Sequence, residues 1–318
     1  MTGTASATGA ALARVHSWQG TAAVTLAAGD LSATFLPELG MLGASLTLRG
    51  EELLALPGGL EGYRQGHVTG LPLLAPWANR LSTRHYRAAG VDVDLDGVEL
   101  HTDPGGLPIH GTVTAHPGWH VTRLDTSGSR AVMAARLDYG AWPELLTAFP
   151  FPHAIEVEAG VDGTALTVTT TLRPSSDQAV PVAFGWHPYL RLPTGPRDGW
   201  RLVLPDREHL ELDARGIPTG ASTAEPAEQE PIAERTFDDL YAIAGDRAVG
   251  LEAEGWRLGV RFEQGYPYAQ VFVPPGAEFA CLEPMTAPTD ALTADACPLA
   301  DPGAVFTTRF SITAEPAG

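Results

Sequence analysis

Glycine and proline recur so often along this chain that they restrict it to short elements of secondary structure. The sequence has 35 Gly and 27 Pro among its 318 residues, and either residue destabilises the interior of a helix. Only PELLTAF (143–149) and TDALTADAC (289–297) are patterned to supply a turn or two of helix. We therefore expect an all-β protein with long loops and little helix.

Alternation of apolar and polar residues between turn signals predicts where the strands lie. Three segments show it clearly, each divided by a turn pair: 22–36 around Gly29-Asp30, 91–100 around Asp96-Gly97, and 153–172 around Asp162-Gly163. Such pairs favour the tight turns that join adjacent antiparallel strands. Further strand candidates are residues 200–213, 249–264, 269–274 and 306–315.

The domain organisation follows from what interrupts the chain. There is no internal repeat and no linker long enough to separate two domains, so residues 13–318 are predicted to form a single domain. Residues 1–12 are expected to be disordered. Residues 219–236, the most polar and Pro-containing stretch, are predicted to be a surface loop.

The charge balance excludes several classes of function. All 20 basic residues are Arg, and 38 acidic residues give a net charge of -18. Without Lys there is no Schiff-base lysine, no pyridoxal phosphate attachment and no Walker A phosphate loop. The negative charge disfavours nucleic acid and anionic membranes as partners. A neutral small molecule is the better expectation.

Cysteine content and the N-terminus bear on compartment. Cys281 and Cys297 are too few for a disulfide framework and have no neighbours at metal-ligand spacing, so we interpret them as small buried residues. The N-terminal segment lacks a basic start and a continuous apolar stretch, and no run approaches the roughly 20 apolar residues of a membrane span. We expect a cytoplasmic protein.

Four segments place polar or titratable residues within apolar or Pro/Gly-rich surroundings. They are GLPLLAPWANRLS (70–82), GLPIHGTV (106–113), FGWHPYLRLP (184–193) and CLEPMTAPTDAL (281–292). In the first, Arg80 follows Asn79 and offers a fixed fork of donors for a carboxylate or for hydroxyls. Its structural alternative is a loop residue whose stem covers Trp77. In the second, Gly111 after His110 permits close approach of a ligand or of another backbone segment.

Glu283 and His187 form the most informative combination. Glu283 follows an apolar strand-like segment, where burial would raise its pKa into the range of a general base; the alternative is a buried Glu paired with an Arg. A carboxylate base with an imidazole acid suits a reaction that takes one proton from a substrate oxygen and gives another to a second oxygen. Two His and one Glu are also a zinc ligand set. The spacing and Pro188 argue against a helical metal motif, so no metal and no cofactor are expected.

Taken in order, the four segments resemble motifs of the aldose 1-epimerase (galactose mutarotase) family. PLLAPWANRLS is similar to its Pro-x-x-Asn-Arg segment, IHG to its His-Gly and GWHPYL to its Gly-x-His-Pro-Tyr-Phe, while LEPMTAPTDAL resembles the Glu-Pro-Met-Thr form of one branch. The motifs extend from about residue 70 to 292. The resemblance implies a large antiparallel β-sandwich with long loops and a monosaccharide as substrate.

The resemblance also implies roles for individual residues. Glu283 would be the general base that takes the proton of the anomeric hydroxyl, and His187 the general acid that protonates the ring oxygen. His110 would bind near the ring oxygen. Arg80, with Asn79 beside it, would hold sugar hydroxyls.

Further sugar contacts are implied by the acidic and aromatic residues of the motifs. The family uses an Asp shortly before an aromatic residue, and Asp238 is preferred over Asp239 by its spacing to Tyr241. Trp186 and Tyr189, with Trp77, are candidates to stack on the sugar, although packing in the walls is their structural alternative.

This chain departs from the family pattern at two places. It carries EPMTAP where many galactose mutarotases have Glu-Thr-Gln, and Leu190 where Phe is usual. We expect a mutarotase for a free aldohexose such as galactose or glucose. The alternatives are a non-catalytic sugar-binding or sensing protein and a hexose-6-phosphate mutarotase, for which Arg84, Arg87 and Arg191 are the candidate phosphate ligands.

Overall fold

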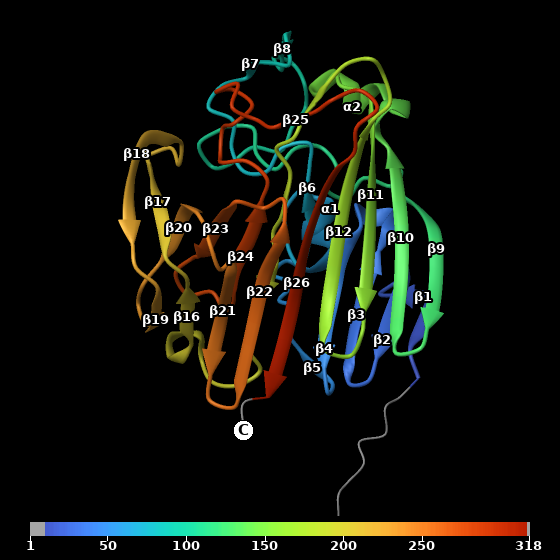
Figure 1. Cartoon of the computed structure of the whole chain (residues 1–318), viewed down its shortest axis with the longest axis vertical. Helices are drawn as coiled ribbons and strands as arrows, with labels where there is room; N and C mark the ends of the chain where they lie inside the picture. Colours follow the sequence, from blue (N-terminus) through green and yellow to red (C-terminus); the bar gives the residue numbers. More distant parts are fainter. Residues whose placement is uncertain (1–9, 317–318) are drawn as a thin grey trace, which may run out of the picture.

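The computed structural model describes residues 10–316 and consists almost entirely of antiparallel β-sheet. The expectation of a disordered N-terminus falls largely on residues 1–9, which lie outside the described residues; the first strand, β1, begins at Leu12. The prediction of an all-β protein with little helix is confirmed (Figure 1).

A nine-stranded sheet runs through the whole molecule. Its strands, in spatial order, are β19 (Glu228–Pro231), β16 (Arg201–Leu204), β21 (Ala248–Ala253), β22 (Trp256–Gln264), β26 (Phe306–Pro316), β12 (Ala165–Pro174), β11 (His153–Val161), β10 (Arg130–Asp138) and β9 (His120–Ser127). In β11 and β12 buried residues alternate with less buried ones, as in a sheet with one face toward the core.

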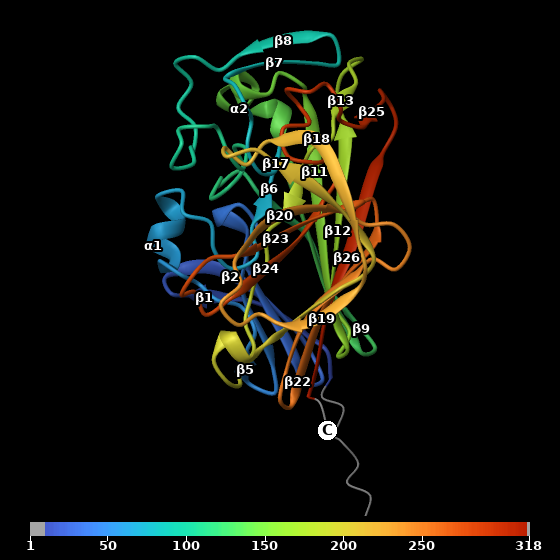
Figure 2. The ribbon, with the colours of Figure 1, turned by 90° about the vertical axis from the view of Figure 1, so that its left-hand side faces the viewer.

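A five-stranded sheet packs on one half of this long sheet. It contains β1 (Leu12–Trp18), β2 (Thr21–Ala28), β3 (Leu31–Leu36), β4 (Leu42–Leu48) and β5 (Glu51–Glu52). Strand β2 lies against β10 and β11, and Leu26 and Phe35 are fully buried between the layers. Figure 2 shows the layers from the side.

An eight-stranded sheet carries most of the candidate site residues and packs on the other half. Its strands are β18 (Pro218–Glu225), β17 (Arg207–Leu212), β20 (Phe237–Ala242), β23 (Tyr268–Val273), β24 (Ala280–Met285), β14 (Gly185–Trp186) and β6 (Leu73–Leu74), with β15 (Tyr189–Leu190) also paired to β24. Trp186 of β14 joins the layers, because its indole N–H donates to Thr170 and its ring packs 5.9 Å from that of Phe310.

The remaining elements are short and connect the sheets. They are the two-stranded sheets β7–β8 (His85–Ala88, Val91–Asp94) and β13–β25 (Val180–Pro181, Leu299–Ala300), the helices α1 (Gly59–Arg64) and α2 (Pro143–Ala148), and three 3-10 turns, η1 (Pro37–Leu39), η2 (Tyr139–Ala141) and η3 (Arg197–Gly199). No helix among residues 10–316 is long and apolar enough to cross a membrane.

Three sequence-based predictions were wrong in detail. Residues 289–297 form turns rather than a helix. Residues 91–100 supply only β8, which pairs with the preceding strand β7. Asp96-Gly97 therefore does not join two strands. Most of 219–236, predicted as a loop, belongs to the exposed strands β18 and β19, whose polar composition reflects position at sheet edges rather than lack of structure.

Candidate active site

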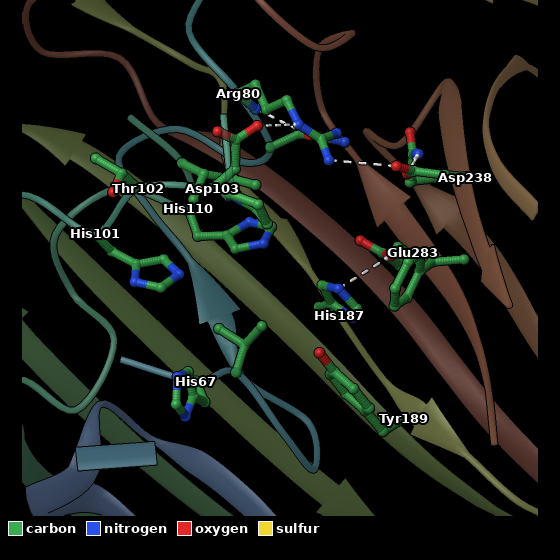
Figure 3. Close-up of a pocket in the computed structure, with 16 residues that line it drawn as sticks. His67, Arg80, His101, Thr102, Asp103, His110, His187, Tyr189, Asp238 and Glu283 are labelled. Carbon is green, nitrogen blue, oxygen red and sulfur yellow. Dashed lines mark hydrogen bonds and ion pairs between the residues drawn. The ribbon is translucent and has the colours of Figure 1, made fainter. Parts of the chain in front are cut away.

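The candidate residues converge on one cavity at the face of the eight-stranded sheet. Its volume is about 420 Å³, within the usual range of small-molecule sites. Of the residues predicted from the motifs, six line it: Asn79, Arg80, His110, His187, Tyr189 and Glu283; so does Asp238, predicted from its spacing to an aromatic. Figure 3 labels all of these side chains except Asn79 and shows the labelled ones around a common space.

Glu283 and His187 are brought together by close packing of β14 on β24. Gly185 pairs with Met285, and a Cβ on Gly185 would lie 2.1 Å from the Met285 sulfur and 2.8 Å from the Pro284 carbonyl oxygen. The glycine of GWHP therefore lets the two strands lie flush. His187 then continues out of β14 with its backbone N–H bonded to the Pro72 carbonyl, 3.1 Å away.

The two side chains face each other without forming an aligned hydrogen bond. His187 Nε2 lies 3.3 Å from Glu283 Oε1, and both side chains are almost completely buried. Glu283 Oε1 and His187 Nδ1 have no hydrogen-bond partner among the described residues. Unpaired buried polar atoms are costly unless a ligand satisfies them, so this end of the cavity is suited to a polar guest.

His110 is held in place by a close approach that only glycine permits. A Cβ on Gly111, at φ +67°, would lie 2.2 Å from the Ala75 carbonyl oxygen. That oxygen accepts the N–H groups of Thr112 and Val113. The His-Gly pair thus fixes its loop against the Asn-Arg segment and brings the His110 ring to 5.6 Å from the His187 ring, edge to face.

Arg80 lies between two carboxylates. Its Nε donates to Asp103 at 2.8 Å and its Nη2 to Asp238 at 3.3 Å. The side-chain Oδ1 of the neighbouring Asn79 accepts from Arg80 Nη1 at 3.2 Å. Because Asp103 is nearly buried whereas Asp238 is 44% exposed, Asp103 fixes the guanidinium and Asp238 stays accessible from the cavity.

Strand alternation distinguishes the two neighbouring aspartates. On β20, Asp238 shares the cavity face with Gln270 of β23, whose amide N–H₂ donates to Asp238 at 2.8 Å. Asp239 points to the opposite face and lies 3.2 Å from His209 Nε2. The structure therefore places Asp238, not Asp239, in the cavity.

Burial shifts the pKa of each catalytic candidate in the direction that favours the neutral form of the group. Desolvation raises the pKa of Glu283 well above its usual value; Asp238 adds to this and Arg80 opposes it. Desolvation lowers the pKa of His187 to about 3. The pKa of His110 is also well below normal, through burial and the nearby His187, His101 and Arg80.

The prediction that Trp186 and Trp77 could stack on the sugar is wrong. Both are buried in the core and neither lines the cavity. Trp186 directly precedes His187, so its side chain points to the opposite face, toward β26. Tyr189, two residues beyond His187, returns to the same side and stacks on the His187 ring at 4.6 Å.

Several lining residues carried no motif that identified them. Gln270 is buried, and its carbonyl oxygen has no partner among the described residues. His67, His101 and Phe272 also line the cavity. Gln270 could have been found only from register, because it pairs directly with Glu283 across β23 and β24.

The arginines considered for a phosphate lie outside this cavity. Arg84 donates to the carbonyls of Leu95 and Val98. Arg87 pairs with Asp92 on the β7–β8 hairpin. Arg191 lines a different hollow.

Side chains with the spacing of metal ligands also lie outside this cavity. Within residues 10–316, the group of three ligating side chains with metal-like spacing is His85, Asp94 and Asp96, all exposed. His110, His187 and Glu283 do not form such a group among those residues.

Comparison with known proteins identifies the family. The family model for aldose 1-epimerase matches residues 23–313, so the chain belongs to the aldose 1-epimerase family. Its members are isomerases acting on carbohydrates, and the protein is accordingly an enzyme with mutarotase-type function and a sugar substrate. No functionally curated protein matches this chain.

Solved structures agree on the fold. A galactose mutarotase-like protein from Clostridium acetobutylicum superposes with a TM-score of 0.86 at 18% identity, covering 97% of this chain and 99% of that one. Galactose 1-epimerase from Lactobacillus acidophilus NCFM gives 0.76 at 13% identity, covering 97% and 99%. A putative aldose 1-epimerase from Escherichia coli K12 gives 0.71 at 18%, covering 91% and 97%. The predicted mutarotase-like β-sandwich is thereby confirmed.

Proposed function

We propose that this enzyme interconverts the α and β anomers of a free aldohexose such as galactose or glucose by acid–base ring opening and closure. The observation that carries the proposal is the Glu283–His187 pair, 3.3 Å apart at the buried end of a sugar-sized cavity. A base and an acid so close can act on two oxygens bonded to the same carbon, which is the arrangement at C1 of a pyranose.

The proposed reaction moves two protons. Glu283 takes the proton from the C1 hydroxyl while His187 donates one to the ring oxygen; the bond between C1 and the ring oxygen breaks and the C1 carbonyl forms. Rotation about the C1–C2 bond presents the other face of the aldehyde. The C5 hydroxyl then attacks C1, His187 regains its proton from that hydroxyl, and Glu283 returns its proton to O1. These side chains account for every proton, so the proposal includes no cofactor.

The opposed pKa shifts fit a pair that holds one proton. Burial favours protonated Glu283 and neutral His187. Transfer of that proton from Glu283 to His187 produces the reactive form without exchange with solvent. Sugar hydroxyls that donate to the Glu283 carboxylate would favour this form, because hydrogen bonds to a charged group stabilise it.

The remaining cavity residues would hold the sugar. Arg80, Asp238 and Gln270 present donors and acceptors together, which suits hydroxyl groups. His110 would bind near the ring oxygen beside His187. Tyr189 would complete the wall and keep the His187 ring in one orientation by stacking on it.

Polarimetry tests the proposal. Fresh α-D-galactose and α-D-glucose should reach anomeric equilibrium faster with the protein than in buffer, and His187→Gln should remove most of the acceleration. A wild-type protein that binds sugars in calorimetry yet accelerates no aldose would instead be the non-catalytic sugar-binding protein, and the proposal would fail.

A further inference from the structure

The cavity extends beyond the catalytic pair in two directions. One arm leads from Glu283 to Gln270, Asp238 and Arg80; Gln270 pairs with Glu283 in register and donates to Asp238. The other leads from His187 to His110, whose rings are 5.6 Å apart, and on to His101, whose ring lies 6.4 Å from that of His110. Figure 3 shows His101 and His67 on the side of the cavity away from Asp238.

A pyranose also has two arms that diverge from C1. One runs through C2 to C3 and carries ring hydroxyls; the other runs through the ring oxygen to C5 and its substituent C6. With O1 at Glu283 and the ring oxygen at His187, the C2 side faces Gln270, Asp238 and Arg80. The C6 side then follows the arm lined by His110, His101 and His67.

The far end of the histidine arm is polar and accessible. His67 is exposed and His101 is partly buried, and both line the cavity, so their ring nitrogens can meet a ligand that enters it. Burial, together with His67, lowers the pKa of His101, so that ring is neutral and offers one donor and one acceptor. A hydroxyl group has the same two capacities.

The backbone at Gly66 passes close to the His101 ring. Gly66, at φ +97°, leaves room for His101: a Cβ at that position would lie 2.9 Å from His101 Nδ1. Gly66 thus lets the chain pass close to His101 and present the next residue, His67, to the same space.

An anionic substituent has no matching charge in this arm. Arg80 is the cationic side chain among the described lining residues, and it already contacts Asp103 and Asp238. A phosphate or carboxylate bound at His101 would therefore lack the charge-assisted contacts that normally recognise it.

We propose that His101 and His67 form a distal subsite that hydrogen-bonds the C6 hydroxyl of a neutral aldohexose, and so select for hexoses with an uncharged hydroxymethyl group. The inference rests on the proposed function and adds to it the part of the sugar that is recognised. His101 and His67 act in binding only, and proton transfer stays with Glu283 and His187.

The experiment compares sugars that differ only at C6. Steady-state mutarotation is measured for D-galactose, for D-fucose, which has a methyl group at C6, and for L-arabinose, which lacks C6. His101→Ala and His67→Ala should each raise KM for D-galactose by about 3- to 10-fold, as expected for loss of one neutral hydrogen bond, with kcat almost unchanged. KM for D-fucose and L-arabinose should barely move. His101→Asn, which retains a donor and an acceptor, should recover part of the loss.

The matched control is His120→Ala, because His120 is an exposed residue of β9 outside the cavity. If wild type prefers glucose, the pair D-glucose and D-xylose replaces galactose and arabinose. Equal KM increases for sugars with and without C6, or no increase, would overturn the subsite while leaving the mutarotase function intact. Inactivity of the wild type on every aldose would overturn both.

An anionic arm of the experiment tests the chemistry. D-galactose 6-phosphate and D-galacturonate should show kcat/KM values at least about tenfold below that of D-galactose, because no free cation meets the charge. A preference for either anion would contradict a subsite for an uncharged group.

Discussion

Two histidines in this molecule, His187 and His209, contact carboxylates, and their surroundings differ in burial and in neighbouring charge. His187 and Glu283 are buried, 3.3 Å apart and not aligned for a hydrogen bond. His209 lies between Glu225, at 2.8 Å, and Asp239, at 3.2 Å, and is partly exposed. Arg207 contacts the same Glu225 at 2.7 Å.

The difference separates a structural contact from a reactive one. The His209 contacts join β17 to β18 and β20, and their charges are matched by Arg207 and by partial exposure to solvent. The His187–Glu283 pair has no such compensation, so burial shifts both pKa values toward neutral forms and leaves atoms unsatisfied. Unsatisfied, shifted groups in a cavity are characteristic of functional sites.

The largest difference between the two contacts should appear in catalysis. Glu283→Gln removes the base and should lower kcat/KM for mutarotation by about 10²- to 10⁴-fold, whereas Asp239→Asn should change it less than about threefold. Polarimetry on both variants gives the comparison. A comparable loss in Asp239→Asn would mean that the contacts of His209 also support the chemistry.

Acid should destabilise the protein through its buried histidines. Their pKa values are lowered in the folded state, to about 3 for His187 and about 4 for His153, so the unfolded chain binds protons that the folded one does not. The contribution of these histidines to stability is thus complete above about pH 6.5 and falls as pH decreases toward the folded pKa values. Between pH 6.5 and 5, His187 and His153 should each lower the free energy of unfolding by about 2 kcal/mol.

Urea unfolding at a series of pH values measures this effect. Glu283 works in the opposite direction because its folded pKa is raised, and His110 in the same direction as the other histidines. His153→Gln removes one contributor outside the active site and should flatten the profile below pH 6.5. An unchanged profile in that variant would contradict the assignment.

The ion pairs around His209 should matter for stability and not for turnover. Arg207 is 3% exposed and pairs with Glu225 and Glu228, so Glu225→Gln leaves a buried guanidinium with one carboxylate. We expect a loss of about 1–2 kcal/mol in unfolding free energy, with kcat/KM within about twofold of wild type. A catalytic defect without a stability loss would reverse the comparison.

The smallest effect is a gain in stability at the active site. A buried Glu whose pKa is raised above 4.5 is costly as pH rises, because the unfolded chain ionises first. Glu283→Gln should therefore stabilise the protein near pH 7, with the difference growing as pH increases and vanishing below about pH 4.5. Thermal unfolding at pH 4.5, 6 and 8 would show the trend.

Local patterns predicted much of the sheet and most of the site. The Gly-Asp and Asp-Gly turns correctly separated β2 from β3 and β11 from β12. The motifs correctly located the cavity-lining Arg80, His110, His187 and Glu283. Their assigned roles in catalysis and sugar binding remain predictions for the assays above.

What the sequence did not predict depends on register and long-range packing. Nothing local marks Gln270 or His101, since one sits in an ordinary strand and the other in a loop. Trp186 was misplaced because its motif ignores alternation. Spacing to Tyr241 favoured Asp238 over Asp239, and the alternation along β20 places Asp238 on the cavity side. Residues 219–236 are polar because they form edge strands, a position that composition does not reveal.

The position of β26 has a consequence for how the protein is made. This strand follows all the others in sequence, yet it lies between β22 and β12 in the middle of the nine-stranded sheet. Until residues 306–316 have left the ribosome, β22 and β12 lack the strand that pairs with both of them. Folding must then wait for late, non-local pairing, which is slow and exposes chains to aggregation. The yield of active protein should accordingly be sensitive to chaperone supply during synthesis.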